Sequence, residues 1–392
     1  MSPKLILLLI FLFPFHIHGQ EGQRISQEQA QFIRAISLLN EDPEQAIDLL
    51  EELYANEQTI RIELEIARAY FSLGEYEIAR AKFIAILDKE LPISVRNNVE
   101  IFLSRIQERQ SPFEFNINAV YDSNPMAVTT TNSVRLFGLD FDYTPQFEKR
   151  DEWGLQSSIS FRKTLSPRII SGINFDFTKY EIDGHQRSYL SPYLSLNGFG
   201  SSNLNFGVSG IFDTYAGESL RNAIRLNTIY NLGIKFGSRI SLFGSTEYSN
   251  YDEYDYLNGE LSTLGVQSQR RLTENVTMLF SYSIKNSQAI SSAYSYRGEE
   301  YRLGITRTNL FKNLEIKIEF NKDIRDYEGL QPFFGIYRND KTDSISASIT
   351  KRDFYFFGLR PVLNFTKLQN NSSVNIMNFD RDFVSLQFLK VY

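Results

Sequence analysis

The sequence predicts an α+β chain with separate domains: a short N-terminal α-helical module followed by a 14-stranded antiparallel transmembrane β-barrel. Two patterns support this fold class. Residues 26–110 carry apolar side chains at helical spacing, whereas the rest of the chain alternates apolar and polar side chains over repeated segments of about ten residues. An apolar leader precedes both parts and agrees with export to an outer membrane.

The leader has the pattern of a cleaved secretory signal peptide. Lys4 supplies a positive charge, and residues 5–15 form an apolar run that is too short to span a bilayer. We therefore expect residues 1–19 to be removed, the alternative being a membrane anchor. The chain contains no cysteine, so neither a lipidated N-terminal cysteine nor a disulfide nor a thiolate metal site is expected.

Residues 24–110 form the predicted helical module. Its best segment, residues 61–92, places small and aromatic residues close to the positions expected of a tetratricopeptide repeat, and Ala46 and Ala79 are 33 residues apart. A short solenoid of this kind usually offers a concave face to a peptide or protein, and the alternative is a spacer or a folding cap. The side chains expected to pack between its helices are Ala67, Tyr70, Gly74, Tyr76, Ala79, Phe83 and Pro92.

Charge and histidine content exclude several functions. Residues 21–111 carry ten basic and seventeen acidic residues, a net charge of −7, whereas residues 112–392 carry 30 of each. We therefore expect no nucleic-acid partner. Two of the three histidines lie in the leader, which leaves His185, an expected solvated loop residue, as the only candidate for a Ser–His dyad. Composition leaves paired carboxylates for glycoside hydrolysis open, without any local signal for them.

Residues 112–392 form the predicted barrel. With the helical module in the periplasm, the first strand, near residues 113–123, runs outward and the last, near residues 380–392, runs inward. An even count then assigns residues 134–143 to a long outer excursion, which leaves Trp153 near the outer interface. A soluble β-sandwich is the alternative, disfavoured by the many long segments. Short turns are expected at residues 164–168, 198–202, 232–239, 271–274, 309–312 and 351–353, and longer connections at 181–186, 214–220, 251–258, 286–295, 323–340 and 368–378.

Charged motifs lie near several strand ends. The first predicted strand closes with Asp122 and Asn124, and oppositely charged residues recur at Arg338 and Asp340, Arg352 and Asp353, and Asp380 and Arg381. Inside a barrel, such pairs can fix strand register and fill the lumen. Gly358 and Pro361 suit a bend or bulge that would weaken the wall and help cargo engage. Tyr392 supplies an aromatic end, an expected address for the barrel-assembly machinery.

These motifs resemble the C-terminal part of the surface lipoprotein assembly modulator family, whose plan of leader, tetratricopeptide module and barrel is also similar. The resemblance is sharpest from Tyr337 onward, and residues 121–124 resemble the motif that closes that family's first strand. Departures include Asn339 where a second arginine is usual and Phe379 where a tyrosine is usual.

The resemblance implies a non-enzymatic outer-membrane translocon without a cofactor. Its partners would be a protein cargo (a surface lipoprotein or a soluble secreted relative), the barrel-assembly machinery and outer-membrane lipid. The sequence shows no phosphate-binding Gly-Lys-Ser/Thr loop, so the driving force would come from folding of the cargo outside. The alternative is a diffusion channel or polysaccharide exporter with a helical periplasmic adaptor, and an outer-membrane hydrolase is a third class.

Overall fold

The computed structural model describes residues 27–390 apart from residues 88, 90, 111–112, 137, 145–147, 167, 183, 199–202, 236, 312, 355 and 357–358. The predicted signal peptide, the Ser111-Pro112 boundary, Gly358 and Tyr392 lie outside the described residues. The chain divides into two compact units, residues 1–106 and residues 107–392.

The first unit is helical, and local capping sets the ends of its helices. Asp42 accepts a hydrogen bond from the backbone N–H of Gln45 at 3.1 Å, and Thr59 caps the following helix in the same way. Gly74 ends that helix with a φ of 93°, a left-handed conformation that glycine adopts without strain. No helix among the described residues is long and apolar enough to cross a membrane. The helices are α1 Gln27–Leu38, α2 Pro43–Asn56, α3 Ile60–Leu73, α4 Tyr76–Leu87 and α5 Ile93–Gln110.

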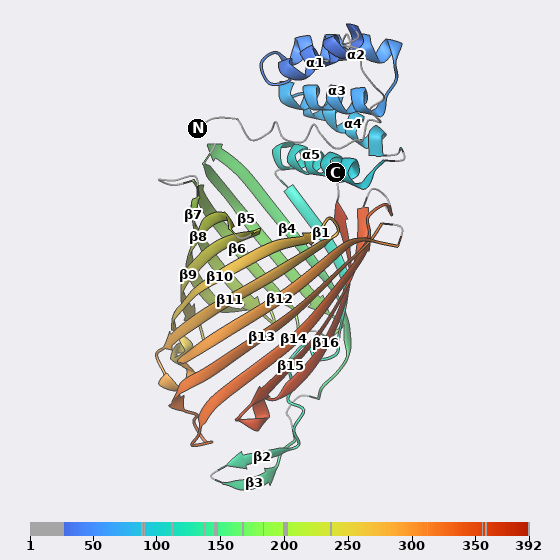
Figure 1. The fold of residues 1–392 in the computed structure, drawn as a ribbon. Coiled ribbons are helices and arrows are strands. Elements are labelled where there is room, and N and C mark those ends of the chain that lie inside the picture. The colour runs from blue at the N-terminus through green and yellow to red at the C-terminus, as the bar shows by residue number, and fades with distance from the viewer. Residues whose placement is uncertain are drawn as a thin grey trace. The chain divides into compact units, whose positions relative to one another are not determined.

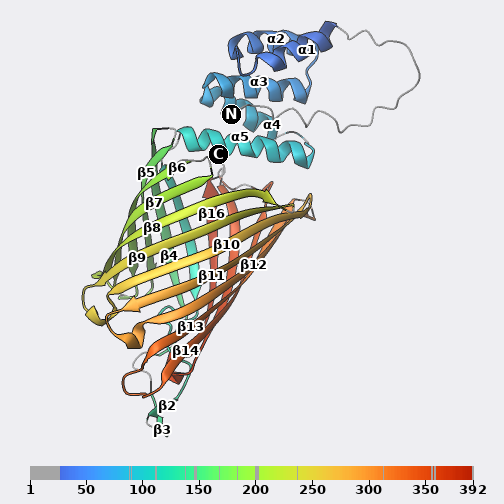
Figure 2. The same ribbon diagram turned by 60° about the vertical axis from the view of Figure 1, so that its left-hand side comes forward.

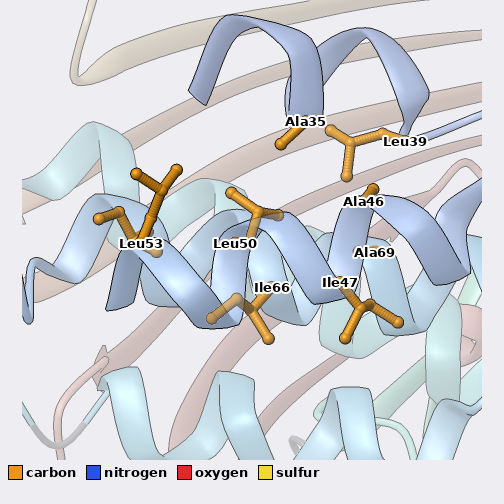
Figure 3. Close-up of a cluster of buried hydrophobic side chains, with 9 residues drawn as sticks. Ala35, Leu39, Ala46, Ile47, Leu50, Leu53, Ile66 and Ala69 are labelled. Carbon is orange, nitrogen blue, oxygen red and sulfur yellow. The ribbon is translucent and has the colours of Figure 1, made fainter. Parts of the chain in front are cut away.

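Apolar side chains at helical spacing fill the interior of this unit (Figure 3). The helices α2 and α4 begin 33 residues apart, at Pro43 and Tyr76. The assignment to tetratricopeptide repeats stays a prediction. The buried cluster consists of Ala35, Leu39, Ala46, Ile47, Leu50, Leu53, Ile62, Ile66 and Ala69.

The predicted packing residues occupy interior or helix-end positions in this unit. Ala67, Ala79 and Phe83 are fully buried, and the Phe83 ring stacks on Phe102 of α5 with centroids 5.2 Å apart. The hydroxyl of Tyr70 donates to Glu51 at 3.1 Å. The ring of Tyr76 lies edge-on to Phe71, Gly74 ends α3, and Pro92 directly precedes α5.

The second unit is a closed antiparallel barrel of fourteen strands, as predicted (Figures 1 and 2). Each strand pairs with its neighbour in sequence, and β16 returns to pair with β1, which closes the wall. The barrel strands are β1 Phe113–Asp122, β4 Glu152–Ser166, β5 Ile169–Tyr180, β6 Arg187–Asn197, β7 Leu204–Tyr215, β8 Glu218–Lys235, β9 Ser238–Tyr251, β10 Gly259–Thr273, β11 Val276–Ala289, β12 Tyr296–Leu310, β13 Leu314–Leu330, β14 Tyr337–Lys351, β15 Leu359–Ser372 and β16 Phe379–Lys390.

The two ends of the barrel differ. At one, here called the excursion end, the chain leaves β1 and forms a separate two-stranded sheet before β4, as expected for residues 134–143 (Figure 1). This sheet consists of β2 Ser133–Leu136 and β3 Leu139–Asp142. The short 3₁₀ helices η1 Asp255–Leu257, η2 Ser292–Tyr294 and η3 Asn375–Met377 lie at the same end. The opposite end, where β1 begins and β16 ends, is here called the terminal end.

Several predicted connections are wrong in length, and three of them illustrate the differences. The connection expected at residues 214–220 is a two-residue turn, Ala216-Gly217, with φ of 54° and 90°. The loop expected at 323–340 shrinks to residues 331–336, whereas after the turn expected at 351–353 the next strand, β15, begins only at Leu359. The first two errors arose because barrel strands carry polar residues on their inward face, which resemble loop sequence.

The structure settles which strand face is outward. In β1, Phe113, Phe115 and Ile117 are exposed, whereas Asn118, Val120 and Asp122 are buried inside. Exposed apolar residues in the same outward phase form a belt on the other strands. Nearer the excursion end, the outward positions of β12, β14 and β15 become charged: Arg297, Glu299, Lys341 and Lys367. Since a tilted strand needs only about 9–11 residues to cross a bilayer, the 17-residue β13 and 18-residue β8 are long enough to extend beyond it.

Candidate functional site

The closing seam between β1 and β16 has the shortest ladder between neighbouring barrel strands in the described chain. Five residue pairs join Asn118–Asp122 to Phe383–Gln387. By contrast, β1 forms ten pairs with β4, and β16 forms twelve pairs with β15. The short ladder lies toward the excursion end, where the predicted motif residues of the first and last strands meet.

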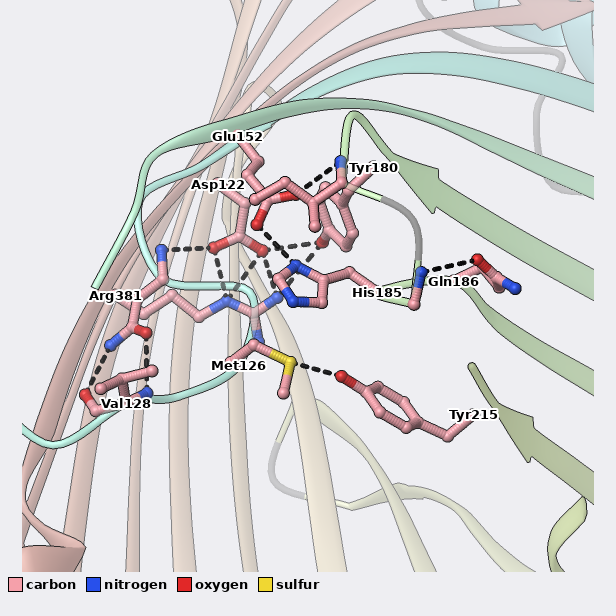
Figure 4. A network of polar contacts seen from close by, with 12 residues as sticks. Asp122, Met126, Val128, Glu152, Tyr180, His185, Gln186, Tyr215 and Arg381 are labelled. Carbon is pink, nitrogen blue, oxygen red and sulfur yellow. Dashed lines mark hydrogen bonds and ion pairs between the residues drawn. The ribbon is translucent and has the colours of Figure 1, made fainter. Parts of the chain in front are cut away.

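A buried ion pair locks the seam at that end (Figure 4). Asp122 ends β1 and is fully buried, and the Arg381 Nε of β16 donates to its two carboxylate oxygens at 2.9 and 3.0 Å. Tyr180, at the end of β5, donates its hydroxyl hydrogen to the same carboxylate at 2.8 Å. The backbone N–H of Asn124 donates at 3.0 Å. Asp122 is thus neutralised and hydrogen-bonded, as a buried carboxylate requires.

The residues after Asp122 extend the lock beyond the strand. Ser123 donates its backbone N–H to the carbonyl of Asp382 at 2.9 Å, and its hydroxyl oxygen accepts from the Asp382 N–H at 2.8 Å. The buried Asn124 amide donates to the carbonyls of Asp380 and Val128, both at 2.9 Å. Asp122, Ser123 and Asn124 are consecutive in the sequence, and each of them connects β1 or the loop after it to another segment of the chain.

His185 is not the solvated loop residue expected from the sequence. Its Nδ1 lies 2.6 Å from the Oε1 of Glu152, which is 2% exposed at the start of β4. The other carboxylate oxygen of Glu152 accepts from the backbone N–H of Ile182 at 3.3 Å. This contact fastens the β5–β6 connection to the wall beside the Asp122 cluster (Figure 4). The sequence alone did not indicate Glu152 as a partner for His185, because Glu152 lies 33 residues earlier in the chain.

Further ion pairs line the inside of the barrel near the excursion end. Arg221 links Asp213 at 3.5 Å to Glu247 at 2.8 Å, and thereby bridges β7, β8 and β9. Arg338 donates its Nε–H to Asp340 at 2.9 Å within β14, and the two predicted residues are therefore partners. This charged collar consists of Arg187, Asp213, Arg221, Arg225, Glu247, Lys285, Glu300, Asp323, Arg325, Arg338 and Asp340.

The collar can brace neighbouring strands and offer polar partners to a passing chain. Four of its five acids, Asp213, Glu247, Asp323 and Asp340, are buried, and each is paired with a basic side chain. A buried charge is tolerated only when it is paired and hydrogen-bonded. Arg338 also lies 4.6 Å from the ring centroid of Tyr327, which holds the guanidinium against the wall.

The side chains of the remaining predicted residues lie outside these clusters. Arg352 and Asp353 lie in the connection at the terminal end, where the Asn313 amide donates to Asp353 at 3.2 Å. Asp380 forms an ion pair with Lys149 at 2.7 Å beside the Asp122 cluster. The charged motifs therefore belong to two ends of the barrel rather than to one site.

The bulge expected at Pro361 is absent from the described part of β15. Pairing with β16 runs without a register shift from Leu359 to Asn370, so Pro361 sits in regular strand. The ladder with β14 begins only at Val362, and near a ladder end proline's missing N–H is readily accommodated.

The helical unit has a groove of its own. A cavity of about 390 Å³ is lined by α2, α3 and α4, with residues that include Tyr54, Glu63 and Ile66. Lys89 donates to Glu63 at 2.6 Å, and Tyr54 donates its hydroxyl hydrogen to the same carboxylate. Burial opposes ionisation of Glu63, but the hydrogen bonds from Lys89 and Tyr54 outweigh it and lower its pKa. Glu63 is therefore an anchored negative charge at the edge of this groove.

Comparisons with known proteins match the second half of the chain to one family. Residues 197–392 match the family described as surface lipoprotein assembly modifier. No curated protein matches the chain.

Solved barrel structures also match the chain. The outer membrane channel DcaP of Acinetobacter baumannii is 9% identical with a TM-score of 0.39, over 70% of this chain and 96% of that chain. OccAB2 of Acinetobacter baumannii is 10% identical with a TM-score of 0.40, also over 70% and 96%. The KdgM porin in complex with disordered oligogalacturonate is 12% identical with a TM-score of 0.31, over 59% and 98%.

Proposed function

Because this chain belongs to the surface lipoprotein assembly modifier family, we propose that it delivers a dedicated surface lipoprotein, or a related secreted protein, from the periplasm to the cell surface. The chain is an outer-membrane β-barrel protein, and its family and fold are those of transport or channel proteins. The family match over the second half of the chain, residues 197–392, carries the proposal. In this account the protein is not an enzyme and uses no cofactor.

The proposed orientation places the terminal end in the periplasm and the excursion end outside. The chain passes from the helical unit to the barrel at the terminal end, because α5 ends at Gln110 and β1 begins at Phe113. At the excursion end the strands are long and carry charged residues at outward positions. This end is therefore suited to lie among lipid headgroups and in water. Trp153 lies outward there, with its ring 5.3 Å from that of Tyr121, as expected of an interfacial aromatic pair.

Three segments have separate tasks in this proposal. Residues 1–19 direct export and are cleaved, residues 24–110 form the periplasmic receiving module, and residues 112–392 form the barrel. The groove lined by α2, α3 and α4 supports the receiving role, because it combines apolar residues with the fixed charge of Glu63. The barrel-assembly machinery would insert the wall, and outer-membrane lipid would surround its apolar belt.

The interior of the barrel suits a polar or unfolded chain. Ion pairs hold the charged side chains of the collar in place. A passing polypeptide can therefore form hydrogen bonds to the collar while the collar charges keep their ion-pair partners. Any force for export would come from folding of the cargo outside, because folding on one side prevents return.

Surface proteomics tests this proposal. Intact cells with and without the protein would be treated with protease, and the released lipoprotein peptides would be identified. We expect one or a few lipoproteins to disappear from the surface fraction while remaining in whole-cell extracts. A periplasm-facing lipoprotein should stay protected in both strains as the control for cell integrity. An unchanged surface set, with reduced solute uptake or polysaccharide output, would refute the proposal in favour of a channel or exporter.

A further inference from the structure

In the described part of the chain, the β1–β16 ladder stops before the terminal end of the barrel. Phe115–Ile117 belong to β1 and Phe388–Lys390 to β16, but within the described chain the pairing of these two strands stops at Asn118 and Gln387. Both stretches are regular strand on their other side, where β1 pairs with β4 and β16 pairs with β15. Each strand therefore turns one backbone edge toward the seam.

This stretch lies at the level of the apolar belt. Phe115 and Ile117 are exposed on the outward face of β1, and Phe388 shares the outward phase of Leu386 in β16. Backbone N–H and C=O groups in hydrocarbon need hydrogen-bond partners, because water is not there to supply them. The partner best suited to a strand edge is another extended polypeptide.

The opposite end of the same seam is fixed. Asp122 and Arg381 form the buried ion pair, and Ser123 exchanges two hydrogen bonds with Asp382. Separation of the two strands is therefore restricted to the terminal end, where the helical unit is joined to β1 through residues 111–112. In the proposed orientation, this stretch lies on the periplasmic side of the barrel, where the cargo starts.

We propose that the terminal half of the β1–β16 seam is a docking edge at which an extended segment of the exported lipoprotein adds as a β-strand. This inference rests on the proposed function and names where that function engages its substrate. Backbone hydrogen bonds to β1 or β16 hold the segment, so recognition requires an extended conformation more than a particular sequence. A flexible segment of the cargo can extend along the seam-facing edge of β1 or of β16. A strand of a second copy of this barrel is less suited to this, because it is already paired within its own barrel wall.

Engineered crosslinks test the docking edge, because the chain has no native cysteine. The variant Ile117→Cys with Phe388→Cys would be closed across the seam with a short, reducible thiol crosslinker in cells. The matched control is Leu363→Cys with Leu386→Cys, which pair across β15 and β16 in the same outward phase. The readout is the surface level of a lipoprotein identified by the protease comparison. We expect the seam crosslink to abolish surface delivery, reductant to restore it, and the control crosslink to leave delivery unchanged.

Photo-crosslinking supplies a second readout that does not depend on blocking transport. A benzophenone amino acid in place of Phe388 should crosslink to the same lipoprotein, whereas one in place of Phe365, outward on β15, should not. Full delivery through the crosslinked seam would overturn the docking edge. A crosslinked dimer of this chain formed by the Ile117→Cys variant alone would also overturn the proposal, since a second copy would then occupy the edge. If removing the whole protein leaves the lipoprotein on the surface, the proposed function itself fails.

Discussion

Replacing Arg381 by methionine would leave Asp122 as an uncompensated charge inside the seam. Asp122 is 0% exposed, and Arg381 binds both of its carboxylate oxygens at 2.9 and 3.0 Å. Removing one partner of a buried ion pair costs about 3–5 kcal/mol. Tyr180 and the backbone of Asn124 still donate to the carboxylate, and the Arg381 side chain is 31% exposed. We therefore expect a loss near the lower limit, about 3 kcal/mol.

Urea unfolding of the purified protein in lipid vesicles would measure this loss. Trp153 is the only tryptophan and lies on β4, opposite Tyr121 in the ladder that adjoins the seam, so its fluorescence follows unfolding of this part of the wall. The free energy of unfolding is obtained by linear extrapolation to zero urea.

Two variants make the comparison decisive. Arg135→Met breaks a similar Arg–Asp pair in the β2–β3 sheet, but its side chains are 68% and 61% exposed, so we expect less than about 1 kcal/mol. Asp122→Asn combined with Arg381→Met should recover part of the loss, because no buried charge remains. An Arg381→Met variant as stable as Arg135→Met, or a double variant no better than the single one, would refute the reasoning.

Three further predictions concern packing and pH. Phe83→Ala should destabilise the helical unit by about 3–4 kcal/mol, because Phe83 is fully buried; limited proteolysis should show faster cleavage of that unit while the barrel keeps its heat-modifiable mobility. Gly265→Ala should cost about 1–3 kcal/mol in urea unfolding, since its Cβ would lie 2.7 Å from a backbone oxygen. Gly244→Ala, whose nearest contact would be 3.6 Å, should be nearly neutral. The lowered pKa of Glu63 contributes stability above the ordinary value of 4.5 that is lost as pH falls through the folded-state pKa, so Glu63→Gln should reduce the acid-induced loss of protease resistance.

The barrel could be predicted because its signal is repeated on every strand. Successive side chains of a strand point to opposite faces, so each strand shows the same alternation of lipid-facing and inward-facing residues. The number of such segments gives the number of strands once the sides of the first and last strands are assigned. Individual loops are harder, since inward-facing polar residues such as Asp323 and Arg325 look like loop residues until their partners are seen. The strand β13 therefore extends to Leu330, well into the loop expected from the sequence.

The seam cluster was only half predictable. Asp122 and Arg381 are recognisable as charged residues at the ends of the first and last strands, and closure of the barrel brings them together across 259 residues. Their partner Tyr180 gives no local signal, because it joins the cluster only through the position of β5 in the wall. That the β1–β16 ladder of the described chain stops at Asn118 on its terminal side is likewise a property of the closed barrel rather than of either strand's sequence.

Gain of surface delivery in a new host tests the central claim most directly. A Gram-negative host without a member of this family would express the lipoprotein identified by protease treatment, carrying an epitope tag, with or without this protein. Antibody labelling of intact cells then reports exposure at the surface. The account predicts labelling only when this protein is present, at equal total amounts of lipoprotein. Equal labelling with and without the protein would contradict it.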